Sequence, residues 1–83
     1  MHRVAIVVTS TLEGPGLSAI YRALMFAQEL HRAGDDVTIV FEGAGSTAAA
    51  AMLDAGHRLH TLFADVRPQV RGVDRLGLLE VEA

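Results

Sequence analysis

The chain has 83 residues, of which 51% are hydrophobic and 20% are charged, so it can form one globular domain over residues 1–83. Seven arginines against ten acidic residues give a net charge of −3, which favours neither nucleic acid nor an anionic membrane as a partner. The absence of cysteine excludes disulfides, thiolate metal sites and thiol nucleophiles.

The first half of the chain predicts a strand, a helix and a second strand. Residues 4–9 form an uninterrupted apolar run, which is typical of a strand covered by helices on both faces. A loop over residues 10–16 contains Gly-Pro-Gly, and a helix is expected over residues 17–33, ended by Gly34. Residues 37–41 form the second apolar run. A βαβ unit of this kind has parallel strands joined by a right-handed crossover.

The expected helix over residues 17–33 is apolar nearly all round, which is more than one sheet contact can bury. The arc expected to face the sheet consists of Ala19, Ile20, Ala23, Phe26, Ala27 and Leu30. The surplus apolar residues are Leu17, Tyr21, Leu24 and Met25. We therefore expect a homo-oligomer with these four side chains in or beside the interface.

The second half predicts shorter elements. Ser46 or Thr47 can cap a helix that runs to residue 55 and stops at Gly56. Four consecutive alanines give that helix little side-chain volume, so its packing should be shallow. Residues 61–71 place Leu62, Phe63, Val66 and Val70 on one helical face. Pro68 should kink or split that helix, and a short third strand is expected at residues 76–81.

Two short motifs, Phe-Glu-Gly-Ala-Gly-Ser and His-Arg-Leu-His-Thr-Leu-Phe, resemble those of the DsrE/DsrF-like proteins of the sulfur-relay superfamily. Residues 41–46 (Phe-Glu-Gly-Ala-Gly-Ser) resemble the acidic-Gly-Ala-Gly turn after the family's second strand. Residues 57–63 (His-Arg-Leu-His-Thr-Leu-Phe) resemble its His-x-Leu-His-x-Leu-aromatic helix start, and the resemblance extends over residues 4–73. It implies a three-layer α/β/α fold with a mostly parallel sheet, shortened to about three strands in the order 3-2-1. It also implies trimers or hexamers.

The resemblance breaks where the family carries its persulfide. Family members hold sulfur on a cysteine in a strand after the Gly-Val pair, whereas here residues 74–77 read Asp-Arg-Leu-Gly and ten residues follow Val73. The resemblance therefore implies a non-catalytic oligomeric subunit or binding module. A truncated copy, a frame-shifted copy, a pared-down paralogue and a gene remnant without function all fit this pattern.

Ligands of open parallel α/β sheets gather at the carboxyl ends of the strands. The residues expected at that edge are Thr9, Ser10, Glu13, Glu42, Gly43, Gly45 and, through the family-like helix start, His60. No serine is paired in sequence with a histidine and an acid, so we expect a pocket rim without a nucleophile and no enzyme. We expect a cytoplasmic protein, because the sequence shows neither a secretory signal nor a membrane-spanning stretch. We expect no cofactor.

Two further patterns suggest other ligands. Residues 14–19 match Gly-x-Gly-x-x-Ala, and Glu42 ends the next strand, so a small nucleotide- or flavin-binding protein is the alternative function. The four residues before Gly14 lengthen the loop, and Glu13 would repel a phosphate, which weighs against this alternative. His57 and His60 have a spacing that suits a metal. A third ligand would have to be Glu42, Asp54 or another distant residue, so capping or surface roles are favoured.

Overall fold

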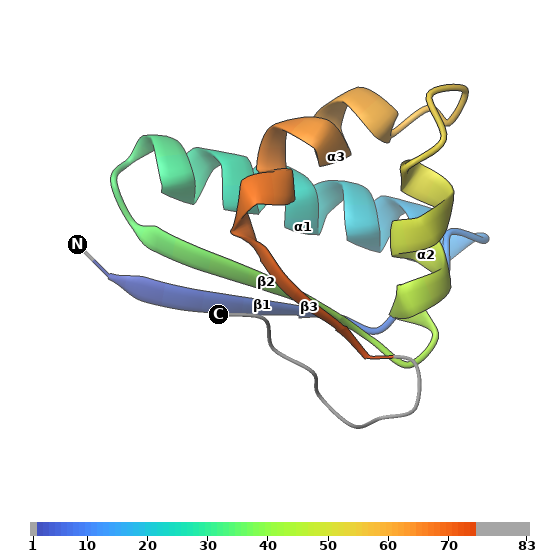
Figure 1. Cartoon of the computed structure of the whole chain (residues 1–83), viewed down its shortest axis with the longest axis horizontal. Helices are drawn as coiled ribbons and strands as arrows, with labels where there is room; N and C mark the ends of the chain where they lie inside the picture. Colours follow the sequence, from blue (N-terminus) through green and yellow to red (C-terminus); the bar gives the residue numbers. More distant parts are fainter. Residues whose placement is uncertain (1, 75–83) are drawn as a thin grey trace.

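The computed structural model describes residues 2–74, which form a parallel three-stranded sheet and three α-helices (Figure 1). The elements in chain order are β1 (Arg3–Val8), α1 (Pro15–Arg32), β2 (Asp36–Glu42), α2 (Gly45–Met52), α3 (His60–Val66), the 3-10 helix η1 (Arg67–Gln69) and β3 (Val70–Asp74). The strand order is β1-β2-β3, and both pairs are parallel. The predicted α/β class with a parallel sheet of about three strands is confirmed. The strand expected at residues 76–81 lies outside the described residues.

The described helices lie on one face of the sheet (Figure 1). Both connections step in the same direction, from β1 to β2 to β3, so crossovers of the same hand pass over the same face. Residues 2–74 therefore provide two of the three expected layers. In β1, Val8 is buried under the helices while Val7, on the opposite face, is 53% exposed. The interpretation of residues 4–9 as a strand covered on both faces is corrected accordingly.

The core lies between the central strand β2 and the helix layer. Val37, Ile39 and Phe41 alternate along β2 on the covered face, and all three are buried. The Phe41 ring meets the Phe63 ring of α3 edge to face, with centroids 5.7 Å apart and an interplanar angle of 76°. This aromatic pair fixes α3 over the middle of the sheet.

Helix α1 is rotated from the expected orientation. Its buried residues are Ile20, Leu24 and Ala27, whereas Phe26, which was expected to face the sheet, is 53% exposed. α1 contacts α3 as well as β1 and β2, so its apolar stripe is shared between the sheet and a neighbouring helix. Leu24 is therefore a core residue, and its expected place in an interface is wrong.

The turn from α1 into β2 follows the sequence closely. Gly34 adopts a φ of 92°, the left-handed conformation that glycine takes most readily at a helix end. The main-chain N–H of His2 donates to Asp35 Oδ1 at 2.9 Å, and Asp36 N–H donates to the His2 carbonyl at 2.8 Å. The first of these bonds holds the pKa of the Asp35 carboxyl below its ordinary value. The start of β1 is thus tied to the start of β2.

Pro68 splits the helix that was expected over residues 61–71, as predicted. α3 ends at Val66, the three residues of η1 follow, and the chain becomes extended at Val70 with φ −73° and ψ 121°. Val70 therefore begins β3 instead of continuing the helical face, which corrects the expected helix over residues 61–71. The β2–β3 register shifts once between Ile39 and Val40, so the new strand joins the sheet irregularly.

Candidate functional site

The carboxyl ends of β1 and β2 meet at one edge of the sheet, as expected from the parallel pairing. Val8 is the register partner of Phe41, so the segments that follow the two strands start side by side. Gly45 lies so close to β1 that a Cβ on it would be 2.1 Å from the Val8 carbonyl oxygen. The expected edge residues that end or follow these strands are Thr9, Ser10, Glu42, Gly43 and Gly45. Glu13 lies exposed farther along the loop to α1.

Gly14 and Gly16, at the start of α1, accommodate the preceding loop itself. A Cβ on Gly16 would lie 2.0 Å from the carbonyl oxygen of Thr11, so the close approach that this glycine permits is already taken by the chain. The main-chain N–H groups of Gly16 and Leu17 donate to the carbonyls of Glu13 and Gly14. In a dinucleotide site the same features receive a pyrophosphate. The geometry of this loop therefore gives the nucleotide alternative no support.

His57 and His60 make separate contacts. The main-chain N–H of Leu59 donates to His57 Nδ1 at 3.0 Å. His60 Nδ1 lies 2.9 Å from the Met52 carbonyl oxygen and must carry the hydrogen, because a carbonyl only accepts. His60 is thus placed at the end of α2 and not at the strand edge that the resemblance implied. Within residues 2–74, no group of three His, Cys, Asp or Glu side chains could hold a metal ion.

The His60 hydrogen bond should stabilise the α2–α3 connection. His60→Ala is expected to lower the free energy of unfolding by about 1 kcal/mol, because the partly buried Met52 carbonyl loses its donor. Urea unfolding measures this difference. His31→Ala, at an exposed position of α1, is the control and should unfold at the wild-type midpoint. Equal urea midpoints for His60→Ala and wild type would show that the hydrogen bond contributes nothing to the free energy of unfolding.

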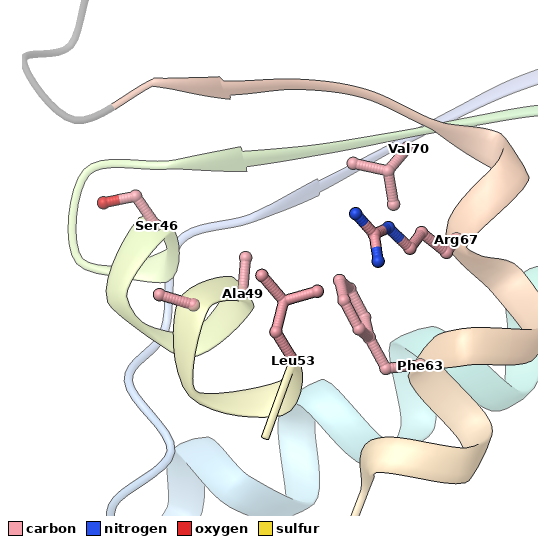
Figure 2. A pocket seen from close by; sticks show the side chains of 7 residues that line it. Ser46, Ala49, Leu53, Phe63, Arg67 and Val70 are labelled. Atoms are coloured by element: carbon pink, nitrogen blue, oxygen red, sulfur yellow. The ribbon is translucent and has the colours of Figure 1, made fainter. Parts of the chain in front are cut away.

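A groove of about 430 Å³ lies between α2 on one side and α3 with η1 on the other (Figure 2). We call it the α2–α3 groove. Its lining residues are Ser46, Ala49, Ala50, Leu53, Phe63, Arg67 and Val70. Five of these seven side chains are apolar, and β3 supplies Val70 where the strand begins. None of the edge residues expected from the sequence lines it.

The alanine run of α2 creates this groove. Ala49 and Ala50 line it on the α2 side, and their methyl groups are too short to fill the space that larger side chains would occupy. On the opposite wall, Phe63 is held in place by its contact with Phe41. The shallow packing of the alanines was predicted, whereas the groove itself was missed. The sequence feature that indicates such a groove is a run of small residues in one helix opposite a helix that carries an aromatic side chain.

Arg67 gives the groove its charge. The guanidinium points into the groove in Figure 2, and it is the one charged group among the lining residues. No carboxylate of residues 2–74 forms an ion pair with it. At the α2 end, Ser46 Oγ donates to the Gly43 carbonyl at 2.7 Å, so its lone pairs can still accept a bond. The groove therefore combines apolar walls with a single cation and one hydroxyl.

Ser46 or Thr47 was expected to cap α2, and this prediction is wrong, because the N-cap residue is Ala44 and no side chain caps the helix. Neither side chain accepts an N–H of the first turn; instead, both hydroxyls donate backwards, to the carbonyls of Gly43 and Ala44. α2 also ends at Met52, three residues before the expected position. Ser46 is nearly buried, and in Figure 2 its hydroxyl points away from Arg67 and Phe63, toward the turn between β2 and α2.

Comparison with known proteins identifies no family, because no protein-family model, no curated protein and no solved structure matches this chain. Among the described helices, none is both long and apolar enough to cross a membrane. The α2–α3 groove is therefore characterised by its own residues and geometry.

Proposed function

We propose that this protein is a non-catalytic binding module whose α2–α3 groove holds a small molecule with an apolar body and one anionic group. A fatty or aromatic carboxylate has this chemistry. The observation that carries the proposal is the position of the Arg67 guanidinium, which points into a groove otherwise walled by Ala49, Leu53 and Phe63. The volume, about 430 Å³, falls within the range of roughly 300–1,000 Å³ found for small-molecule sites.

The two kinds of contact have different roles. Apolar ligand surface covered by the walls contributes roughly 25 cal/mol per Å², so the body of the ligand supplies most of the affinity. The Arg67 guanidinium can hold a carboxylate through two parallel hydrogen bonds. Because Arg67 is exposed, this pair is screened by water and contributes selectivity for an anion more than strength.

Binding without catalysis follows from the lining chemistry. The groove contains one hydroxyl, that of Ser46, and neither histidine nor carboxylate among its lining residues to activate it. Ser46 also donates its hydrogen to the Gly43 carbonyl. A bound carboxylate would therefore meet a positioning cation, with no base for nucleophilic attack.

The resemblance to DsrE/DsrF-like proteins supports the same class of function. Each of the two family-like motifs supplies one groove residue, Ser46 from the first and Phe63 from the second. We propose that the chain is a cytoplasmic relative of the sulfur-relay proteins in which a binding groove remains without the sulfur-carrying cysteine. A homo-oligomer belongs to this proposal, with the exposed Tyr21 and the half-buried Leu17 and Met25 at its contact.

Octanoate and benzoate are suitable probes for isothermal titration calorimetry. Wild type should bind at least one of them saturably, and Arg67→Gln should weaken that binding about threefold, since one exposed, water-screened charged contact is lost. Ala50→Leu should abolish it by filling the groove. Ala51→Leu, on the same helix but outside the lining, and Arg58→Gln are the matched controls and should bind like wild type. Equal affinity in Ala50→Leu and Ala51→Leu would place the ligand elsewhere.

A further inference from the structure

A second cleft, of about 300 Å³, lies between the C-terminal turns of α1 and the segment of α3 and η1. We call it the α1–η1 cleft. Its lining residues are Gln28, His31, Arg32, Asp65, Val66, Pro68 and Gln69. Five of the seven are polar or charged, so this cleft differs in chemistry from the α2–α3 groove.

Gln69 is the residue that distinguishes this cleft from an ordinary surface depression. It is 9% exposed, and its side-chain amide makes no hydrogen bond to any group of residues 2–74. Buried amides nearly always have partners, because an unpaired one costs free energy. Since Gln69 lines the cleft, a ligand there can supply both the acceptor and the donor that residues 2–74 do not offer its amide.

The same cleft presents both signs of charge. Asp65 Oδ2 accepts a hydrogen bond of 2.6 Å from Gln28 Nε2, which fixes the carboxylate against α1. Arg32 and His31 lie in the last turn of α1. The planar guanidinium of Arg32 suits a carboxylate, and Asp65 suits an ammonium group. The negative end of the α1 dipole lies at the same end of the helix and also favours an ammonium group.

We propose that the α1–η1 cleft binds a free α-amino acid. Its carboxylate would pair with Arg32, its ammonium group with Asp65, and its remaining polar atoms with the Gln69 amide. The small volume of the cleft suits a ligand of this size. This proposal is independent of the α2–α3 groove, because the two lining sets share no residue.

The two glutamines provide a direct readout. The chain contains Gln28 and Gln69 and no asparagine, so both of its side-chain amides line this one cleft. In a ¹⁵N–¹H spectrum of the full chain, they give two NH₂ signal pairs. The twenty common L-amino acids, added singly at millimolar concentration, should include at least one that shifts both pairs saturably. Its deaminated acid and its decarboxylated amine should each bind about tenfold more weakly, because each lacks one charge.

Variants separate binding from folding. Gln69→Leu should weaken binding about tenfold, read from the Gln28 pair, and should raise Tm because the unpaired amide is gone. Arg32→Gln should remove the preference for the amino acid over its amine, whereas Arg22→Gln, outside the cleft, should leave binding unchanged. The proposal is overturned if no amino acid shifts the glutamine pairs, or if Gln69→Leu binds as tightly as wild type. Neither result would affect octanoate binding in the other groove.

Discussion

Gly45→Ala is expected to lower the free energy of unfolding by about 3 kcal/mol, a large part of the stability of an 83-residue domain. The added Cβ would lie 2.1 Å from the Val8 carbonyl oxygen and 2.8 Å from its carbon. Both atoms belong to the backbone of β1, which cannot move without disturbing its pairing with β2. The start of α2 would have to shift away from the sheet, and urea unfolding followed by circular dichroism measures the loss.

Gly56→Ala is the matched control for this prediction. Its Cβ would meet Asp54 side-chain atoms at 3.6 Å and beyond, which is an ordinary van der Waals distance. Gly56 also lies outside the positive-φ residues, so alanine should cost little there. A Gly45→Ala protein as stable as Gly56→Ala would show that α2 does not start against β1 as described.

Leu24→Glu should prevent folding at neutral pH. Leu24 is 0% exposed and belongs to the core cluster between α1, the sheet and α3. A carboxylate at this position would be buried without a partner, and its apolar contacts would be lost, together several kcal/mol or about the whole stability of a small domain. Circular dichroism should show an unfolded chain.

Tyr21→Glu distinguishes core from surface on the same helix. Tyr21 is 46% exposed, so a glutamate there should leave the domain folded with a nearly unchanged midpoint. If the proposed oligomer uses this side of α1, light scattering should show the mass of Tyr21→Glu falling to the 8.8 kDa monomer. A folded Leu24→Glu protein that merely dissociates would contradict the buried position of Leu24.

Local sequence patterns were sufficient for the elements that depend on local chemistry. Both apolar runs became paired strands, Gly34 ended α1 in a left-handed conformation, and Pro68 divided the later helix. β3 was missed because Val70 continues the helical spacing of Phe63 and Val66. Its extended conformation depends on pairing with β2, a contact that no local pattern encodes.

The predicted orientation of α1 was wrong for a related reason. Alanines and large apolar residues occur on all sides of α1, so the helical pattern alone allows several faces to be the buried one. Contact with α3 selects the face that contains Ile20 and Leu24 as the buried face of α1. A second, sequence-distant helix therefore decided which side chains are exposed.

The candidate site was only partly accessible to sequence reasoning. Parallel pairing correctly brought the ends of β1 and β2 together, and the alanines of α2 were correctly expected to pack shallowly. The groove that results joins Ser46 to Phe63 and Arg67, residues about 20 apart whose meeting depends on where Pro68 turns the chain. His60, placed at the strand edge by resemblance, instead bonds to Met52.

The most direct test of the α2–α3 groove is a ¹⁵N–¹H titration of the wild-type protein with octanoate and, separately, with 1-octanol. We expect saturable shifts of the main-chain amides of Ala49, Ala50, Phe63 and Val70, with octanol binding about threefold more weakly because it lacks the charge that meets Arg67. Shifts confined to the strand edge, or no saturable shift with octanoate, would contradict this expectation.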